Sequence, residues 1–83
     1  MALLVVEERF DPAIDPSQVN PNAEKLSPCL PVHDVTWVAS YLAQDGTRCI
    51  CVYEAPDADA VRRAYRSAGM KFEAVWPAKG MLA

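Results

Sequence analysis

The sequence predicts an α+β fold in which two helices cover one face of a four-stranded antiparallel sheet. Three observations lead to this prediction. Residues 35–69 have the pattern of a strand, a tight turn, a second strand and a helix. The apolar stretch at residues 2–10 adds a strand before this run, and residues 72–76 add a short one after it. With 83 residues, the chain is long enough for one domain only.

The first three strands are expected at residues 2–10, 35–42 and 47–54, which are rich in branched and aromatic side chains. The last two of these strands are separated by Asp45-Gly46. An Asp-Gly pair between two apolar runs is a strong signal of a hairpin, because its glycine accepts a left-handed backbone. The sequence therefore predicts that these two strands pair directly.

The segment between the first two strands is less regular, because residues 13–32 contain four prolines. Proline removes a hydrogen bond from a helix interior and clashes with the preceding turn, so Pro21 should interrupt a helix at this position. We therefore expect a broken first helix, with residues 22–30 as its better half and a kink near Pro28.

The second helix is expected to begin at Pro56-Asp57, where a carboxylate lies near the positive end of the helix dipole. It should end at Gly69, which supplies the left-handed residue that commonly follows a helix. One apolar stripe recurs at helical spacing and should face the sheet: Val61, Ala64, Tyr65 and Ala68.

The last strand, at residues 72–76, should stop at Pro77. Residues 1–77 then form a single domain, and residues 78–83 a loose tail. The element order β-α-β-β-α-β is the ferredoxin-like split pattern. Right-handed crossovers give this pattern the strand order 4-1-3-2, with both helices on one face of the sheet.

Side chains alternate between the two faces of a strand, so each predicted strand divides into two sets. We expect the aliphatic set to form the core under the helices: Leu4, Val6, Phe10, Val38, Leu42, Ile50 and Val52. The other set should then lie on the open face: Glu7, Trp37, Tyr41, Cys49, Cys51 and Tyr53. Because a large exposed apolar patch marks an interaction site, we predict a homodimer through the open face.

Composition argues against two classes of partner. The net charge of −3 lacks the concentrated basic surface that phosphate binding needs, so nucleic acid is not an expected partner. No apolar run approaches the roughly 18 residues that span a bilayer, so no membrane partner is expected either. The apolar start lacks the basic residues of a signal peptide, which makes the cytoplasm the expected location. Three cysteines are an odd number and favour free thiols.

Several motifs taken together resemble a known family. These motifs are V-E-x-x-F-D-P at residues 6–12, P-C-L at 28–30, W-x-x-S-Y-x-x-x-D-G at 37–46, C-V-Y-E-A-P-D-A at 51–58 and A-V-R-x-A-x-R-x-A-G at 60–69. The chain resembles a family of small bacterial ferredoxin-like proteins, formerly of unknown function, with one nickel-binding branch. The resemblance implies a ferredoxin-like dimer that binds metal in at least part of the family. It does not place metal ligands on particular residues.

Nickel accepts imidazole, carboxylate and thiolate ligands. The candidate metal ligands are therefore His33, which is the single histidine, together with Glu7 and Cys51. Cys49 lies two residues before Cys51 and should point the same way. The alternatives remain open: a lone histidine in a proline-rich turn is more often a surface residue, and two strand cysteines are more often small buried apolar groups.

Glu7 is expected in the middle of a central strand, where a carboxylate needs a partner. It either pairs with an arginine at the rim or faces the tyrosines as a ligand or general base. If the protein is an enzyme, the candidate catalytic residues are Glu7, Tyr41 and Tyr53. A pocket or interface on the open face would be lined by Trp37, Tyr41, Cys49, Cys51 and Tyr53.

Three functions remain in competition. The first is a dimeric, possibly nickel-binding protein without clear catalytic machinery. The second is a small-molecule binder or enzyme with a pocket on the open sheet face. The third is an interaction module without a ligand.

Overall fold

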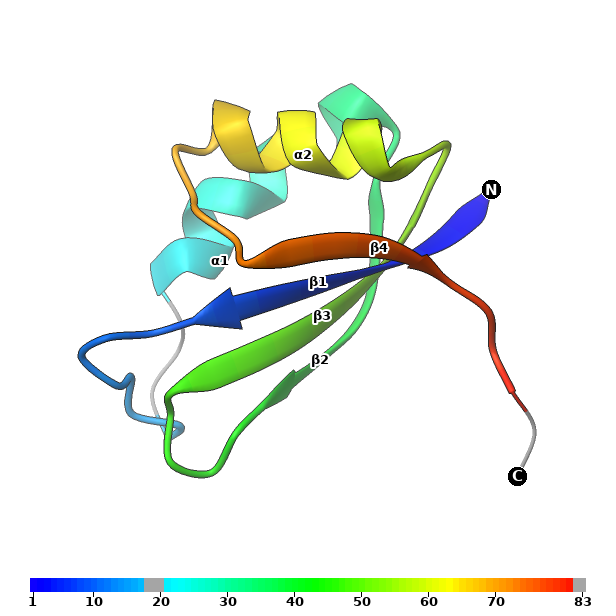
Figure 1. The fold of residues 1–83 in the computed structure, drawn as a ribbon. Coiled ribbons are helices and arrows are strands. Elements are labelled where there is room, and N and C mark those ends of the chain that lie inside the picture. Colours follow the sequence, from blue (N-terminus) through cyan, green and yellow to red (C-terminus); the bar gives the residue numbers. More distant parts are fainter. Residues whose placement is uncertain (18–20, 82–83) are drawn as a thin grey trace.

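The computed structural model describes residues 1–17 and 21–81 of the chain. Within these residues a four-stranded antiparallel sheet forms one layer and the helices form a second layer on top of it (Figure 1). The strands are β1 (Ala2–Arg9), β2 (Thr36–Leu42), β3 (Arg48–Ala55) and β4 (Ala74–Ala78). The helices are α1 (Pro21–Leu26) and α2 (Ala58–Ser67), and the 3-10 turns η1 (Ser27–Cys29) and η2 (Pro31–His33) follow α1.

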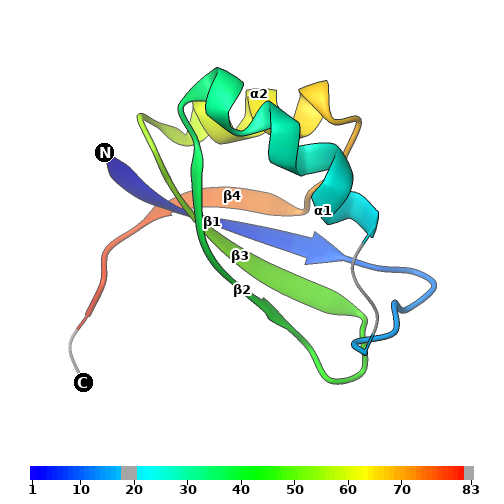
Figure 2. The same ribbon diagram turned by 180° about the vertical axis from the view of Figure 1, so that it is seen from behind.

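The strand order is β2-β3-β1-β4, which is the predicted order 4-1-3-2 counted from the other edge. Seen from behind, both helices still lie on the same side of the sheet (Figure 2). The predicted α+β ferredoxin-like fold is confirmed. No helix in the described part of the chain is long and apolar enough to cross a membrane.

The helix α2 has the predicted start, end and buried stripe. The side chain of Asp57 caps it by accepting a hydrogen bond from the backbone N–H of Ala60 at 2.9 Å. At the other end Gly69 adopts a φ of 69°, the left-handed backbone that glycine accepts without strain. Val61, Ala64 and Tyr65 are completely buried against the sheet.

The proline-rich segment forms a short helix and two 3-10 turns. Pro21 is the first residue of α1, a position where proline needs no hydrogen-bond partner. Pro28 lies in η1, where the α-helix has already tightened, as the predicted kink required. Part of the expected helical segment, residues 18–20, lies outside the described residues.

The hairpin between β2 and β3 turns at Gly46, which has a φ of 73°. Asp45 Oδ1 accepts hydrogen bonds from the backbone N–H and the hydroxyl of Thr47, at 3.0 and 2.6 Å. The Gly46 carbonyl also accepts the N–H of Ile14 at 3.0 Å. A side chain at position 46 would collide with the Ile14 carbonyl, so glycine is needed there for space as well as for backbone angle.

The predicted end of β4 is wrong. The strand starts later than expected, includes Pro77 and ends at Ala78, and Pro77 lies opposite Leu4 of β1. Proline is tolerated here because β4 is an edge strand, where the missing N–H need not bond to a neighbour. The strand thus crosses the expected boundary between residues 77 and 78.

The face assignment is correct for β1, where Leu4 and Val6 are completely buried, but wrong for β3. Cys49, Cys51 and Tyr53 lie under the helices rather than on the open face, and they belong to the buried core. The reason is the register: Cys51 lies opposite Val6, and Tyr53 opposite Leu4. Residues directly opposite each other in an antiparallel pair point to the same face. Ile50 is instead 42% exposed on the open face, and Val52 is only half-buried there.

The alternation in β2 is interrupted by a bulge between Trp37 and Ala39. A bulge adds one residue to the strand and so exchanges the two faces beyond it. Trp37 and Leu42 therefore both lie on the helix side, although they belong to opposite predicted sets. Val38, at the bulge, is 47% exposed and not in the core. Tyr41 stays on the open face, as predicted, opposite Ile50.

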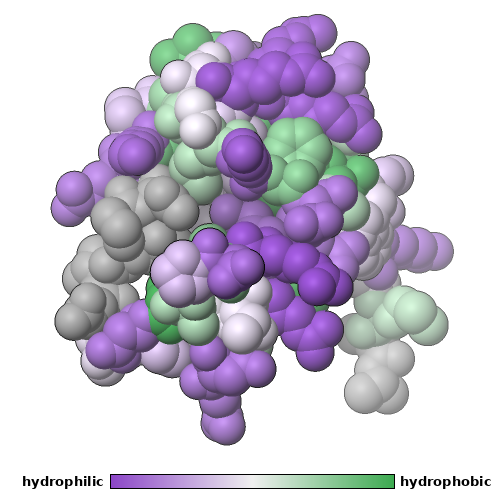
Figure 3. Space-filling model, turned by 60° about the vertical axis from the view of Figure 1, so that its left-hand side comes forward, coloured by the Kyte–Doolittle hydropathy of each residue, from purple (hydrophilic) through white to green (hydrophobic). Residues whose placement is uncertain are grey.

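Exposed apolar side chains gather on the open face of the sheet. Tyr41, Ile50 and Trp76 are 68%, 42% and 43% exposed, and they come from three different strands. Figure 3 shows a more polar side of the molecule, where hydrophilic side chains cover most of the visible surface between small separate hydrophobic areas.

Candidate functional site

Glu8, Cys49 and Cys51 form a buried group that we call the acid–thiol cluster. Their ligand atoms, one carboxylate oxygen and two Sγ atoms, all lie within 4.8 Å of one another. Glu8 lies directly opposite Cys49 in the β1–β3 ladder, and Cys51 is two residues further along β3. The three side chains therefore share the helix-covered face of the sheet. Glu8 is only 5% exposed.

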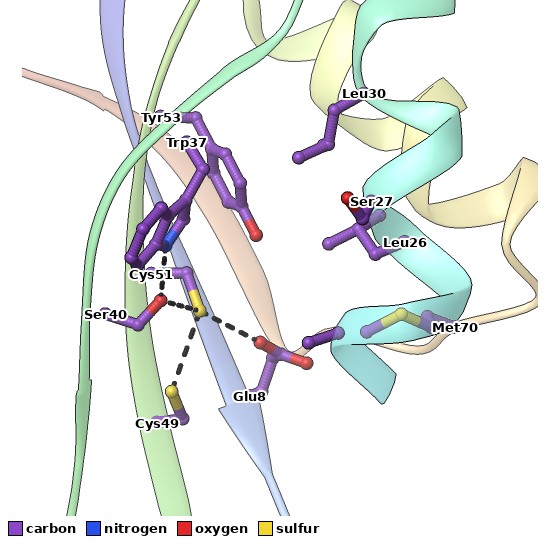
Figure 4. Close-up of a pocket in the computed structure, with 11 residues that line it drawn as sticks. Glu8, Leu26, Ser27, Leu30, Trp37, Ser40, Cys49, Cys51, Tyr53 and Met70 are labelled. Atoms are coloured by element: carbon purple, nitrogen blue, oxygen red, sulfur yellow. Dashed lines mark hydrogen bonds between the residues drawn. The ribbon is translucent and has the colours of Figure 1, made fainter. Parts of the chain in front are cut away.

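A row of hydrogen bonds connects the cluster to β2. Cys51 Sγ lies 3.3 Å from Glu8 Oε2, to which it donates, and 3.6 Å from Cys49 Sγ. The hydroxyl of Ser40 donates to Cys51 Sγ at 3.1 Å and accepts from the indole N–H of Trp37 at 2.8 Å. The bulge in β2 makes this row possible, because it brings both Trp37 and Ser40 to the helix side (Figure 4).

Two tyrosines continue the hydrogen bonding on the other side of Glu8. The Tyr65 hydroxyl, from the buried stripe of α2, donates to Glu8 Oε2 at 3.3 Å. The Tyr53 hydroxyl lies 2.9 Å from that of Tyr65. Because Tyr65 has one hydroxyl proton and gives it to Glu8, Tyr53 must be the donor in this pair. The two rings meet edge to face, with centroids 6.1 Å apart.

Burial dominates the protonation of the cluster. It raises the pKa of Glu8, and the hydrogen bonds from Cys51 and Tyr65 lower it only in part. It also raises the pKa of Cys51 to about 12 and raises the pKa of Cys49. Both thiols are therefore protonated at neutral pH unless a bound cation replaces their protons.

A cavity of about 350 Å³ lies above the cluster, between the sheet and the α1–η1 segment. Leu26, Ser27 and Leu30 line it from the helical side, and Trp37 and Tyr53 from the sheet (Figure 4). Most of the lining is apolar. The acid–thiol cluster forms its polar end, so the cavity has one chemically distinct side.

The predicted site residues lie around two hollows. Trp37, Cys51 and Tyr53 line the cavity under the helices, and Glu7 and Tyr41 border a second hollow that also includes Arg48. Cys49 borders both. The expected pocket combining Glu7 with Tyr53 on the open face is therefore wrong, because the two side chains lie on opposite faces. Glu7 instead accepts a hydrogen bond from the indole N–H of Trp76 at 2.9 Å.

His33, a predicted metal ligand, lies in η2 and is not part of the acid–thiol cluster. Its Nε2 is 3.2 Å from the hydroxyl of Ser67 at the end of α2. Of the three predicted metal ligands, the structure places only Cys51 in a group of potential ligands among the described residues.

Glu8 is the functional candidate that sequence reasoning missed. The signal was present, because Glu8 continues the alternation of Leu4 and Val6 and so belongs to the face assigned to the core. A carboxylate on a core face is rare unless it has partners, and this makes such a position a candidate site.

The fold and this site define a small ferredoxin-like α+β protein with a buried carboxylate and two thiols beneath an apolar cavity. The family profile described as "Nickel responsive protein SCO4226-like" matches residues 4–77. The chain belongs to the SCO4226-like family, which confirms the resemblance inferred from the motifs.

A crystal structure of SCO4226 from Streptomyces coelicolor A3(2) has a similar fold. The match has a TM-score of 0.83 at 18% sequence identity and covers 98% of this chain and 100% of that chain. At this identity the match supports the fold and not the site. No match was found among the curated proteins.

Proposed function

We propose that this protein binds nickel at the acid–thiol cluster, as a homodimer. The observation that supports nickel binding most directly is the convergence of the Glu8 carboxylate and the two Sγ atoms within 4.8 Å. The description of the family as nickel responsive agrees with this choice of metal.

The spacing of the ligand atoms suits a metal ion. Two thiolates bound to a four-coordinate divalent ion at about 2.3 Å lie about 3.7 Å apart. The sulfur atoms of Cys49 and Cys51 are 3.6 Å apart, and the Cys51 sulfur is 3.3 Å from Glu8 Oε2. Little movement is therefore needed for these three atoms to surround one ion. Any further ligand would enter from the cavity side.

The ligand types favour some metals over others. Magnesium and calcium prefer oxygen ligands, whereas nickel, copper and zinc accept thiolates. Because both thiols are protonated without a metal, binding must release protons, and affinity should rise with pH. Nickel is the ion of this group that the family description names.

Nickel titration of the chelator-treated, untagged protein, followed by native mass spectrometry, tests the proposal. We expect one nickel ion per chain and a sulfur-to-nickel charge-transfer band in the near-ultraviolet. Cys49→Ala/Cys51→Ala should abolish both signals. Cys29→Ala is the matched control, because Cys29 is a free thiol outside the cluster.

His33→Ala should also retain the nickel ion. Nickel uptake that survives the double cysteine substitution, or that disappears with Cys29→Ala or His33→Ala, would place the metal elsewhere. No uptake at all by the wild-type protein would contradict the proposal outright.

The open face of the sheet supports the dimer part of the proposal. No helix of the described residues covers this face (Figures 1 and 2). Tyr41, Ile50 and Trp76 supply exposed apolar surface on this face. A second copy of the chain presents the same area, as two-fold symmetry requires.

A further inference from the structure

The geometry points to a second function for the cavity above the acid–thiol cluster, the binding of a small, flat, largely apolar organic molecule that bears one hydroxyl or amino group. This inference does not depend on the metal. It follows from the size of the cavity, from its two apolar walls and from one polar group at its end.

The size of the cavity suits a small ligand. Its volume of about 350 Å³ lies at the lower end of the range of roughly 300–1,000 Å³ that ligand pockets occupy. A molecule with up to three aromatic rings is therefore the largest class that it should admit.

The walls of the cavity suit a flat ring. Leu26 and Leu30 face the sheet from the helical side, and Met70 lies nearby (Figure 4). Opposite them, Trp37 and Tyr53 present aromatic side chains from neighbouring strands. A ring between these walls would contact aliphatic groups on one side and aromatic groups on the other, which apolar and aromatic ligands favour.

Glu8 supplies the polar group that would orient the ligand. Among the described residues, both hydrogen bonds to its carboxyl group end at Oε2, and none reaches Oε1. Ser40 already donates to Cys51 and accepts from Trp37, so it has less capacity to spare. A hydroxyl or amino group at one end of the ligand would give Oε1 a partner, because Glu8 lines the cavity.

Fluorescence titration with N-phenyl-1-naphthylamine, on chelator-treated protein, tests the cavity directly. This aromatic amine is weakly fluorescent in water and bright in apolar surroundings. We expect saturable binding of one molecule per chain with micromolar affinity. Leu30→Trp, which places a large ring in the cavity, should weaken binding at least about tenfold. Val32→Trp is the matched control, because Val32 is 74% exposed and does not line the cavity.

Displacement of the bound probe tests the polar end. 2-Naphthol and 2-methylnaphthalene have nearly the same shape, but only the naphthol has a hydroxyl. The naphthol should displace the probe at a concentration roughly 2- to 10-fold lower, the effect of one net hydrogen bond. Glu8→Leu should remove this preference while the probe still binds. Near-ultraviolet circular dichroism verifies that each variant is folded.

Three results would overturn the inference. They are equal binding by Leu30→Trp and the wild-type protein, loss of binding in Val32→Trp, and absence of saturable binding to the folded wild-type protein. The metal proposal is tested separately, because the probe titration uses metal-free protein and the nickel titration uses no probe. Saturable probe binding by a protein that takes up no nickel would support the cavity and contradict the metal proposal, and the reverse result would do the opposite.

Discussion

At the scale of single residues, Glu8 is the most informative position. A buried carboxyl group is costly unless it is hydrogen-bonded or neutralised. Here Cys51 and Tyr65 both donate to Oε2, and Tyr53 in turn supports Tyr65. The two tyrosines therefore differ in their partners: Tyr65 bonds directly to Glu8, whereas Tyr53 is connected to Glu8 through Tyr65.

This inequality gives a matched pair of variants. Tyr65→Phe removes a donor from Glu8 and leaves the Tyr53 hydroxyl without its acceptor, so we expect the free energy of unfolding to fall by about 1–3 kcal/mol. Tyr53→Phe leaves the Tyr65–Glu8 bond in place and should cost only about 0.5–1.5 kcal/mol. Urea denaturation of the three proteins measures both values. Equal losses, or the larger loss for Tyr53→Phe, would show that the hydrogen bonds do not run from Tyr53 through Tyr65 to Glu8.

At the scale of elements, the local signals predicted the fold well. Asp57, Gly69 and the Asp45-Gly46 turn each impose a backbone geometry that their neighbours cannot avoid, and all three appear where expected. The element order then leaves few topologies, and the strand order expected from right-handed crossovers is the one observed. Signals of this kind depend on adjacent residues only, which is why the sequence reveals them.

The faces of β2 and β3 were harder to predict, because they depend on distant partners. An aliphatic set was expected in the core, but Tyr53 and Cys51 are buried because Glu8 and Tyr65 satisfy their polar atoms. Those partners lie on β1 and α2. The bulge after Trp37 has no distinctive residue in the sequence, so alternation alone could not locate it. The acid–thiol cluster depends on the same register, which explains why only Cys51 was among its predicted ligands.

The hairpin offers a test at this scale. The hydrogen bonds from the hydroxyl and the backbone N–H of Thr47 lower the pKa of Asp45 below its ordinary value of 3.8. A carboxylate with a lowered pKa stabilises the folded chain above its unfolded pKa and loses this effect as the pH falls through the folded one. Asp45→Ala should therefore lower the melting temperature at about pH 6, with the gap to wild type narrowing towards about pH 2.

Thermal melts of both proteins across this pH range measure the gap. Thr47→Val removes the hydroxyl donor but keeps the backbone N–H, so it should show a weaker form of the same pH dependence. A gap that stays constant as the pH falls would mean that the Asp45 charge does not stabilise the turn.

At the scale of the whole molecule, the two faces of the sheet differ in what they contain. The helix-covered face contains the acid–thiol cluster and the cavity, so both proposed ligands reach the protein from that side. The open face contains no part of the cluster and is lined by exposed apolar side chains. A short chain buries only about 60% of its unfolded surface, so covering this face should also stabilise the fold.

Ile50→Lys tests the proposed dimer. Ile50 lies on β3, a central strand, and opposite Glu7 on the open face, so a lysine there can remain solvated or pair with Glu7 in an isolated chain. In the dimer the same lysine would lose its water, and we expect association at least about tenfold weaker. Analytical ultracentrifugation at micromolar concentrations should show a dimer for the wild-type protein and a monomer for Ile50→Lys. Val32→Lys, which adds the same charge at a 74% exposed position on the helix side, should remain dimeric. A monomeric wild-type protein, or dissociation caused by Val32→Lys and not by Ile50→Lys, would contradict an interface on the open face.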